Sequence, residues 1–423
     1  MRSPKTARRR ARIIRSAIVF AGLLSSVSPP LIAQDPSPAL AQPGSRETWH
    51  ESMVRTALPK EGCFKVSYPN TDWQEVPCTT PPSFPLPRTR VGGNSSDTVG
   101  GGGSNDFVAQ VTSGLISTAE GSFLSVTPGI TETGIDPYTG QATANAFTLQ
   151  LNTNTFTTPA ISICAPKSCN AWQQFVFDNY SISGSTPTPA QAYMQYWLLG
   201  YGTQCPTGWS SYSGDCYRNS RKSVSIPTQT LADLAQLSLS GTAVSGGVDM
   251  VTLMAPGDEL YAMGADSVFG LSQEWLAAEF NIFGDLNSTE ANLSSGSTIV
   301  VKVSVDNGTT DAPTYVQKSF TGETDNLTLV PPPCLYGGAS PAMEFMETNA
   351  ASPVATCFSS GLQAFTTLAS FSATDGENPR AGLVQATNGN LYGTTRGTDR
   401  NRPDRARRIH RRGRNGRSHQ ADV

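Results

Sequence analysis

The chain has 423 residues, of which 38% are hydrophobic and 15% are charged, and its formal net charge is −3. The charge is unevenly spread, because seven of the 30 basic residues lie in the first fifteen positions and ten lie between Arg396 and Val423. Residues 16–395 keep 13 basic residues against 30 of the 33 acidic ones, a net charge of about −17. A body this acidic disfavours nucleic acid and anionic lipid as partners.

The N-terminus has the pattern of a secretory signal peptide. The basic residues of the first fifteen positions precede an apolar run, Ala17–Leu24, and a small-residue cleavage site, Ala39–Ala41. Serines and prolines from Ser25 to Pro30 end the run well short of the roughly 20 residues that a membrane anchor needs. We therefore predict a cleaved signal over residues 1–41. The mature protein is then secreted, either extracellular or periplasmic, without a membrane partner.

Eight cysteines, an even number, indicate disulfides in an exported chain. Neighbouring cysteines enclose short segments rich in turn residues, so we predict four local pairs in chain order. These pairs are Cys63–Cys78, Cys164–Cys169, Cys205–Cys216 and Cys334–Cys357. A zinc site is the alternative, but the chain has no CxxC motif and only three histidines, so we expect no metal.

Residues 42–105 are expected to form a disulfide-stapled lead-in and a linker. Proline is frequent from Pro81 to Pro87, and Gly92–Gly103 has the composition of a flexible linker. The lead-in is either a removable pro-segment or an N-terminal subdomain, and we slightly favour the subdomain.

From Asp106 the sequence changes to short runs of β-branched and aromatic residues, many of them alternating with period two as strands do. The clearest runs are Phe107–Thr112, Gly121–Val126, Ala146–Leu151, Trp172–Phe177, Tyr193–Leu199 and Thr298–Val305. Only Thr230–Leu239 and Val268–Ala278 favour a helix. The pattern predicts a mainly β protein in which residues 106–347 form one antiparallel β-sandwich with long, disulfide-stapled loops.

Residues 348–395 are expected to be a linker and a single partial repeat. Residues 362–395, which end in the run Gly382–Thr395, resemble one unit of a bacterial extracellular tandem repeat with a "GLVQATDGN-YGTT" core. A single unit lacks the neighbours on which such repeats depend. The tail 396–423 has ten arginines and no aromatic residue, which predicts disorder. We favour a shifted reading frame over a selected basic arm, because glycine codons in GC-rich DNA read one base out of register encode arginine.

The histidine count restricts the possible chemistry. The three histidines, His50, His410 and His419, all lie outside the predicted sandwich. A Ser-His-Asp site, a Cys-His site and a histidine-ligated catalytic metal are therefore disfavoured. No phosphate-loop or dinucleotide motif is present, so we expect no cofactor. Carboxylates and side-chain amides remain, as a general base with an oxyanion donor or as two carboxylates that cleave a glycosidic bond.

Four short motifs, in order along the chain, resemble the eqolisin-type glutamic peptidases. They are Gly121–Pro128, Phe147–Gln150, Trp172–Val176 and Ala278–Ile282. The resemblance implies a concanavalin-like or lectin-like jelly roll and a secreted acid endopeptidase with a polypeptide substrate. It also implies that Gln150 and Glu279 form the catalytic pair. The chain departs from the family beside Trp172, where an acid is replaced by Gln173 and Gln174.

A non-catalytic lectin-like module that binds an extracellular polysaccharide or surface is the alternative. Its aromatic platform would consist of Tyr193, Tyr196, Tyr201, Trp197 and Trp209, although core packing is the simpler interpretation of these rings. For both functions we expect a monomer.

Overall fold

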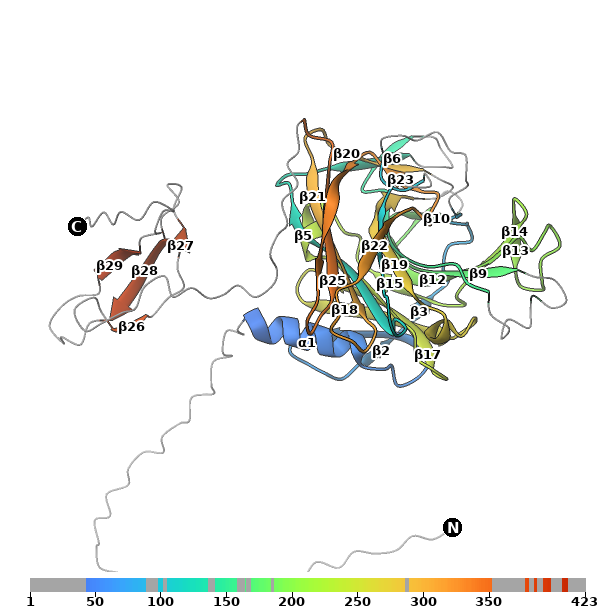
Figure 1. Cartoon of the computed structure of the whole chain (residues 1–423), viewed down its shortest axis with the longest axis horizontal. Coiled ribbons are helices and arrows are strands. Elements are labelled where there is room, and N and C mark those ends of the chain that lie inside the picture. The colour runs from blue at the N-terminus through green and yellow to red at the C-terminus, as the bar shows by residue number, and fades with distance from the viewer. Residues whose placement is uncertain are drawn as a thin grey trace, which may run out of the picture.

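The computed structural model describes residues 43–88, 98–101, 105–135, 141–157, 164, 169–183, 186–285 and 289–351, together with four strands between 377 and 409. The chain is mainly β, and its sheets are almost wholly antiparallel (Figure 1). The predicted signal peptide lies outside the described residues. Within those residues, no helix is both long and apolar enough to cross a membrane.

The first large sheet has nine strands in the order β2-β1-β18-β17-β16-β5-β21-β25-β24. In chain order the strands are β1 (Gly62–Ser67), β2 (Gln74–Val76), β5 (Thr118–Val126), β16 (Ser238–Thr242), β17 (Val248–Ala255), β18 (Glu259–Asp266), β21 (Thr298–Asp306), β24 (Thr328–Tyr336) and β25 (Ala342–Thr348).

The second large sheet has ten strands. Eight follow the order β13-β14-β12-β9-β8-β19-β4-β22, while β15 pairs with β12 and β3 pairs with β15. In chain order they are β3 (Cys78–Thr79), β4 (Phe107–Gln110), β8 (Phe147–Thr153), β9 (Asn170–Asp178), β12 (Ala190–Leu199), β13 (Ser210–Tyr212), β14 (Asp215–Asn219), β15 (Ser223–Ile226), β19 (Ala277–Gly284) and β22 (Thr314–Gln317). Every run that the sequence predicted as a strand contributes to one of these two sheets.

Smaller elements accompany the two large sheets. A four-stranded sheet contains β6 (Glu132–Ile135), β7 (Ala142–Ala144), β20 (Glu290–Leu293) and β23 (Thr324–Asp325), and β10 (Ser181–Ser183) pairs with β11 (Thr186–Thr188). The helices whose bounds lie within the described residues are α1 (Pro43–Arg55) and the 3-10 helices η2 (Leu231–Gln236) and η3 (Leu271–Gln273).

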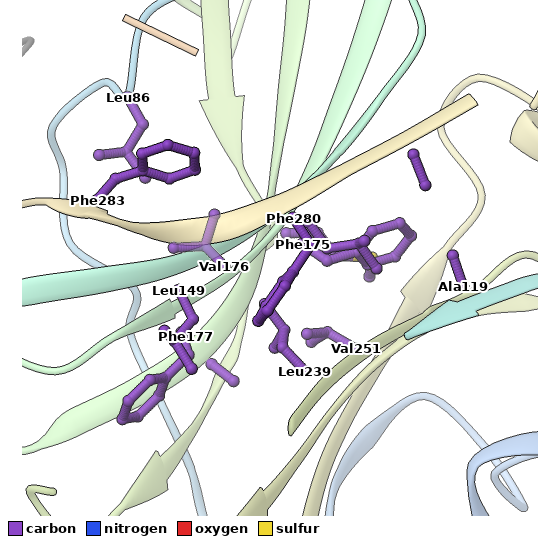
Figure 2. Packing of buried hydrophobic residues seen from close by; sticks show 14 of the residues in the cluster. Leu86, Ala119, Leu149, Phe175, Val176, Phe177, Leu239, Val251, Phe280 and Phe283 are labelled. Carbon is purple, nitrogen blue, oxygen red and sulfur yellow. The ribbon is translucent and has the colours of Figure 1, made fainter. Parts of the chain in front are cut away.

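The two large sheets pack against each other through apolar faces. Phe280 of β19 lies directly over Gly121 of β5, where an added Cβ would be 1.8 Å from the Cγ of the ring. Phe175 of β9 lies over Gly241 of β16 in the same way, at 2.4 Å. Figure 2 shows Phe175 and Phe280 within this core, beside Leu239. Glycine is required at both positions because the opposing rings occupy the space of a side chain.

Strands of the lead-in pair with strands of both large sheets. Strand β1 pairs with β18 in the nine-stranded sheet, and β3 pairs with β15 in the ten-stranded sheet. The helix α1 packs on the nine-stranded sheet, where Trp49 and Met53 form a small apolar cluster with Leu260.

The first predicted helical run is helical over six of its ten residues, as a 3-10 helix, and the second is wrong over most of its length. The helical part of Thr230–Leu239 is η2, and the helical part of Val268–Ala278 is η3. Strand β16 begins at Ser238 and β19 begins at Ala277, because sheet partners on both sides hydrogen-bond these backbones.

Three of the predicted disulfides are present in the described residues. They are Cys63–Cys78, Cys164–Cys169 and Cys205–Cys216, with Cα–Cα distances of 5.3, 5.7 and 5.6 Å. Cys334 is also disulfide-bonded. Cys357, which the sequence predicts as its partner, lies outside the described residues.

The C-terminal part has a small sheet of β26 (Glu377–Pro379), β27 (Val384–Gln385), β28 (Leu391–Arg396) and β29 (Arg405–Ile409). Strand β29 belongs to the tail for which the sequence predicts disorder, yet it pairs with β28 of the partial repeat. The edge of a strand offers unpaired N–H and C=O groups to any extended segment, whatever its composition.

Candidate functional site

The four central strands of the ten-stranded sheet carry a buried polar face. Successive side chains of a strand alternate between the two faces, so the neighbours of Phe175 and Phe280 point away from the apolar core. We call this surface the polar face. Its members on β8, β9, β12 and β19 include Thr148, Gln150, Asn152, Gln174, Asp178, Gln191, Tyr193, Gln195, Trp197, Glu279 and Asn281, each no more than 3% exposed.

The strand register brings Gln150 and Glu279 onto this face together. Gln150 of β8 lies opposite Asn281 of β19, and Glu279 lies opposite Asn152. The two residues are therefore diagonal neighbours on adjacent antiparallel strands, a relation in which Cα atoms are typically about 7–8 Å apart.

A chain of hydrogen bonds connects the two residues. The amide nitrogen of Gln174 donates to Gln150 Oε1 at 3.2 Å and to Asn152 Oδ1 at 3.0 Å. The amide nitrogen of Asn152 donates to Glu279 Oε2 at 2.9 Å, and Trp197 Nε1 donates to Gln174 Oε1 at 3.0 Å. This chain fixes the orientation of all three amides.

The amide nitrogen of Gln150 points away from Gln174. It donates to Thr148 Oγ1 at 3.0 Å and to Glu323 Oε2 at 3.5 Å. The donor group of Gln150 therefore faces the segment that contains Glu323, which covers this part of the sheet.

Glu279 is completely buried. Both of its carboxylate oxygens accept the backbone N–H of Phe320, at 3.0 and 3.1 Å. Burial raises the pKa of Glu279 to about 7, although the hydrogen bonds from Asn152, Phe320, Ser319 and Thr321 act in the opposite direction. A carboxyl group with a pKa near 7 exchanges its proton close to neutral pH, as general acids and bases do.

More carboxyl groups lie close to Glu279 on the side of β4 and β25. Burial raises the pKa of Asp106 strongly, and the charges of Glu279 and Glu347 add to the effect. Asn281 Nδ2 donates to Glu347 Oε2 at 3.0 Å, and burial raises the pKa of Glu347 to about 8. In the described part of the chain, no group of three or more His, Cys, Asp or Glu residues is arranged to hold a metal ion.

Two segments of the chain close the polar face. The loop Lys318–Glu323 lies over Glu279, as the bonds from Phe320 show, and residues 81–88 lie over β12 and β14. A cavity of about 440 Å³ reaches the same loop and is lined by residues that include Asn154, Ala277 and Phe320.

Most of the aromatic residues considered from the sequence are buried, and Tyr193 and Trp197 among them belong to the polar face. Trp172, Trp197 and Tyr193 are 0% exposed, Tyr196 and Trp209 are also buried, and Tyr201 is only half-buried. His50 belongs to α1, and its Nε2 is 2.7 Å from Glu120 Oε1 of the nine-stranded sheet.

Sequence reasoning missed the residues that connect the pair. Gln174 stands inside one of the motifs that drew attention to the chain, and Asn152 follows Gln150 by two positions on the same strand. The signal that was available is the polar position at every second residue of β8, within a strand whose residues are all buried.

Comparison with known proteins adds no family to this description. No protein-family model matches the chain, and no curated protein matches it significantly.

Proposed function

We propose that the chain is a secreted hydrolase of peptide bonds, similar in type to the glutamic peptidases, and that Gln150 and Glu279 form its catalytic pair. One observation carries the proposal. Two residues chosen from separate short motifs lie diagonally on one buried face of adjacent strands, within a single chain of hydrogen bonds.

In this mechanism Glu279 acts as the general base. Its carboxylate takes a proton from a water molecule as the water oxygen attacks the carbonyl carbon of the scissile bond. The amide of Gln150 donates a hydrogen bond to the oxyanion that forms, and Glu279 then passes the proton to the leaving amine nitrogen. Asn152 and Gln174 are positioning residues, because they hold the carboxylate and the amide in fixed orientations.

The proposed fold for this activity is a lectin-like β-sandwich of the jelly-roll type. Its support is the packing of two large antiparallel sheets through Phe175 and Phe280, with the polar face on the outer side of the second sheet.

The arrangement also sets a condition for activity. With its pKa at about 7, Glu279 holds a proton in mild acid and cannot act as a base there. When water enters the site, the desolvation that raises this pKa decreases, and the carboxyl group ionises at lower pH. Turnover in acid therefore requires the loop over Glu279 to move.

The experiment is digestion of a denatured protein substrate at about pH 4, well below the folded pKa of Glu279. We expect the wild-type chain to cleave the substrate and Glu279→Gln to show no turnover, since the amide cannot accept the proton. Glu259→Gln, a change in the other sheet, is the control and is expected to match the wild type. Equal cleavage by wild type and Glu279→Gln would exclude the proposed role.

The alternative function, a lectin-like binding module, has less support. Four of the five rings expected to form its platform are buried, and they therefore offer no face on which a sugar can stack. Binding of a polysaccharide by the intact chain, without cleavage of any peptide, would favour this alternative.

A further inference from the structure

Residues 81–88, with the sequence PPSFPLPR, lie across the polar face on the side of β12 and β14. Four of the eight residues are prolines, which restrict the backbone and lower the entropy lost on binding. The segment has no secondary structure apart from one isolated bridge at Arg88. We call it the covering segment.

Gln195 holds the centre of the covering segment by its backbone. Its Oε1 accepts the N–H of Leu86 at 2.8 Å, and its Nε2 donates to the carbonyl oxygen of Phe84 at 3.1 Å. Because Pro85 and Pro87 have no N–H, the donor of Leu86 is the only one in this stretch of three residues.

Two side chains of β14 hold the beginning of the segment in the same manner. Tyr217 Oη donates to the carbonyl oxygen of Ser83 at 3.0 Å, and Asn219 Nδ2 donates to that of Pro82. Both residues belong to the polar face, since they lie opposite Trp197 and Gln195 of β12.

The end of the segment meets the loop that closes the proposed catalytic site. Gly322 donates its N–H to the carbonyl oxygen of Pro87 at 2.7 Å, and Arg88 forms a β-bridge with Thr321. The same loop bonds Glu279 through Phe320. The covering segment and the loop therefore close the face as one unit.

Apolar side chains of the segment fill the remaining space. Leu86 is 0% exposed and Phe84 is 7% exposed. Figure 2 shows Leu86 beside Phe283, on the opposite side of β19 from Phe280.

The chemistry of these contacts is that of peptide recognition. Side-chain amides and a phenol bind backbone groups, which every polypeptide has, and the apolar side chains at positions 84 and 86 fill buried sites. A purely structural cover has no need of a polar face beneath it, because apolar side chains cost less to bury.

We propose that the polar face is a binding groove for an extended, proline-containing polypeptide, and that the covering segment occupies it as an intramolecular ligand. The part that concerns regulation rests on the proposed peptidase function. The tethered segment competes with any polypeptide in solution at a high effective concentration. In the chain as described, the covering segment and the loop close Glu279 off from water and substrate, so both must move before the site can turn over substrate.

The test uses the full chain and a fluorescently labelled synthetic peptide with the sequence of residues 81–88. The double variant Phe84→Gly/Leu86→Gly loosens the covering segment and leaves the groove intact. We expect this variant to bind the peptide about ten-fold more tightly than the wild type does, or better, because the tethered competitor is weakened. Adding Gln195→Ala should abolish the gain. The matched control is Ser83→Ala, which changes an exposed side chain of the same segment and should bind like the wild type.

Equal peptide binding by wild type and a folded double variant overturns the inference, and so does a gain that Gln195→Ala leaves unchanged. If the double variant does not fold, hydrogen exchange decides the question in the otherwise native chain. The amide of Leu86 should exchange at least about ten-fold faster in Gln195→Ala than in Ser83→Ala, since one bond of about 1.4 kcal/mol holds it. Equal exchange overturns the inference.

The same variants separate this inference from the proposed activity. Tighter peptide binding without faster cleavage of substrate supports the groove and counts against the peptidase. Faster cleavage without a change in peptide binding supports the peptidase and counts against the covering segment as a ligand.

Discussion

Two glutamates, one in each large sheet, have opposite electrostatic surroundings. Glu120 of β5 is 18% exposed and contacts His50 of α1 at 2.7 Å. Burial by itself raises the pKa of Glu120, but the charge and hydrogen bond of His50, with Ser238 and Lys302, lower it overall. Glu279 of β19 is completely buried among amide and backbone donors, and burial raises its pKa to about 7.

The difference shows how a fold separates structural from chemical carboxyl groups. A carboxylate beside a cation stays ionised, and its charge holds two elements together. A carboxyl group among neutral donors has no such compensation, so it retains a proton that it can exchange near neutral pH. The contact of Glu120 attaches the lead-in helix to the body, whereas the site of Glu279 is suited to proton transfer.

The largest effect on activity is expected for Gln150, the proposed catalytic partner of Glu279. Gln150→Ala should lower kcat by about 10² to 10³-fold, the usual cost of one oxyanion donor. The control is Gln191→Ala, which lies on the same face but bonds Ser223 instead of the proposed site. Steady-state cleavage of a peptide substrate measures both variants, and an equal loss in the two would show that the face acts only as a structural unit.

The second effect is the dependence of stability on pH. The folded chain binds the Glu279 proton more tightly than the unfolded chain does, so this group makes folding less favourable as the pH rises from about 4.5 to about 7. In the wild type this group should lower the free energy of unfolding by up to about 3 kcal/mol between these two pH values, and Glu279→Gln should remove that decrease. Urea unfolding at both pH values measures the change, and an unaltered slope would contradict the raised pKa.

Glu120→Gln should change the pH dependence of stability in the opposite direction. The lowered pKa of Glu120 means that its stabilisation is present above about pH 4.5 and is lost as the pH falls through the folded value. The variant should therefore be less stable than the wild type at pH 5.5 and closer to it at about pH 3. The same urea series tests this, and variants with parallel pH profiles would remove the contrast between the two glutamates.

A smaller effect is expected at His50. Burial alone lowers the pKa of His50, but the charge and hydrogen bond of Glu120 and the charges of Glu51 and Glu47 raise it overall. Its contribution is therefore complete below about pH 6.5 and is lost as the pH rises through the raised value. His50→Gln should cost about 1 kcal/mol at pH 5.5 and less at about pH 9. Thermal unfolding checks this, with Asp311→Asn, a change at an exposed position outside α1, as the control. An equal cost of His50→Gln at both pH values would contradict it.

The smallest effect is expected for an ion pair on the nine-stranded sheet. Lys65 and Glu259 are 2.6 Å apart, and both side chains are 32% exposed. Lys65→Met should change the free energy of unfolding by less than about 1 kcal/mol, and added salt should reduce the difference further. A larger change would mean that exposure is a poor guide to the strength of the carboxylate contacts compared above.

Local patterns in the sequence were sufficient for the class of the fold. Period-two alternation predicted strands that the structure contains, such as Phe147–Thr153 and Thr298–Asp306, and short spacing predicted Cys205–Cys216. Local patterns failed where sheet pairing outweighs them. The run from Thr230 to Leu239 suggests a helix, yet its end joins the sheet at Ser238 between two partner strands. The hairpin of β17 and β18 was also missed, although Pro256-Gly257-Asp258 marks its turn.

The sequence by itself determined which residues were available for chemistry, because it places no histidine in residues 106–347 and puts Gln150 and Glu279 within strand-like motifs. Only the tertiary structure decided that these two residues share a face. Their relation depends on the register of β8 against β19, which is set by contacts between segments far apart in the chain. The position of the covering segment over the polar face also depends on contacts between segments far apart in the chain. The contact of Leu86 with Gln195 joins residues 109 positions apart, and no local pattern encodes a hydrogen bond over that separation.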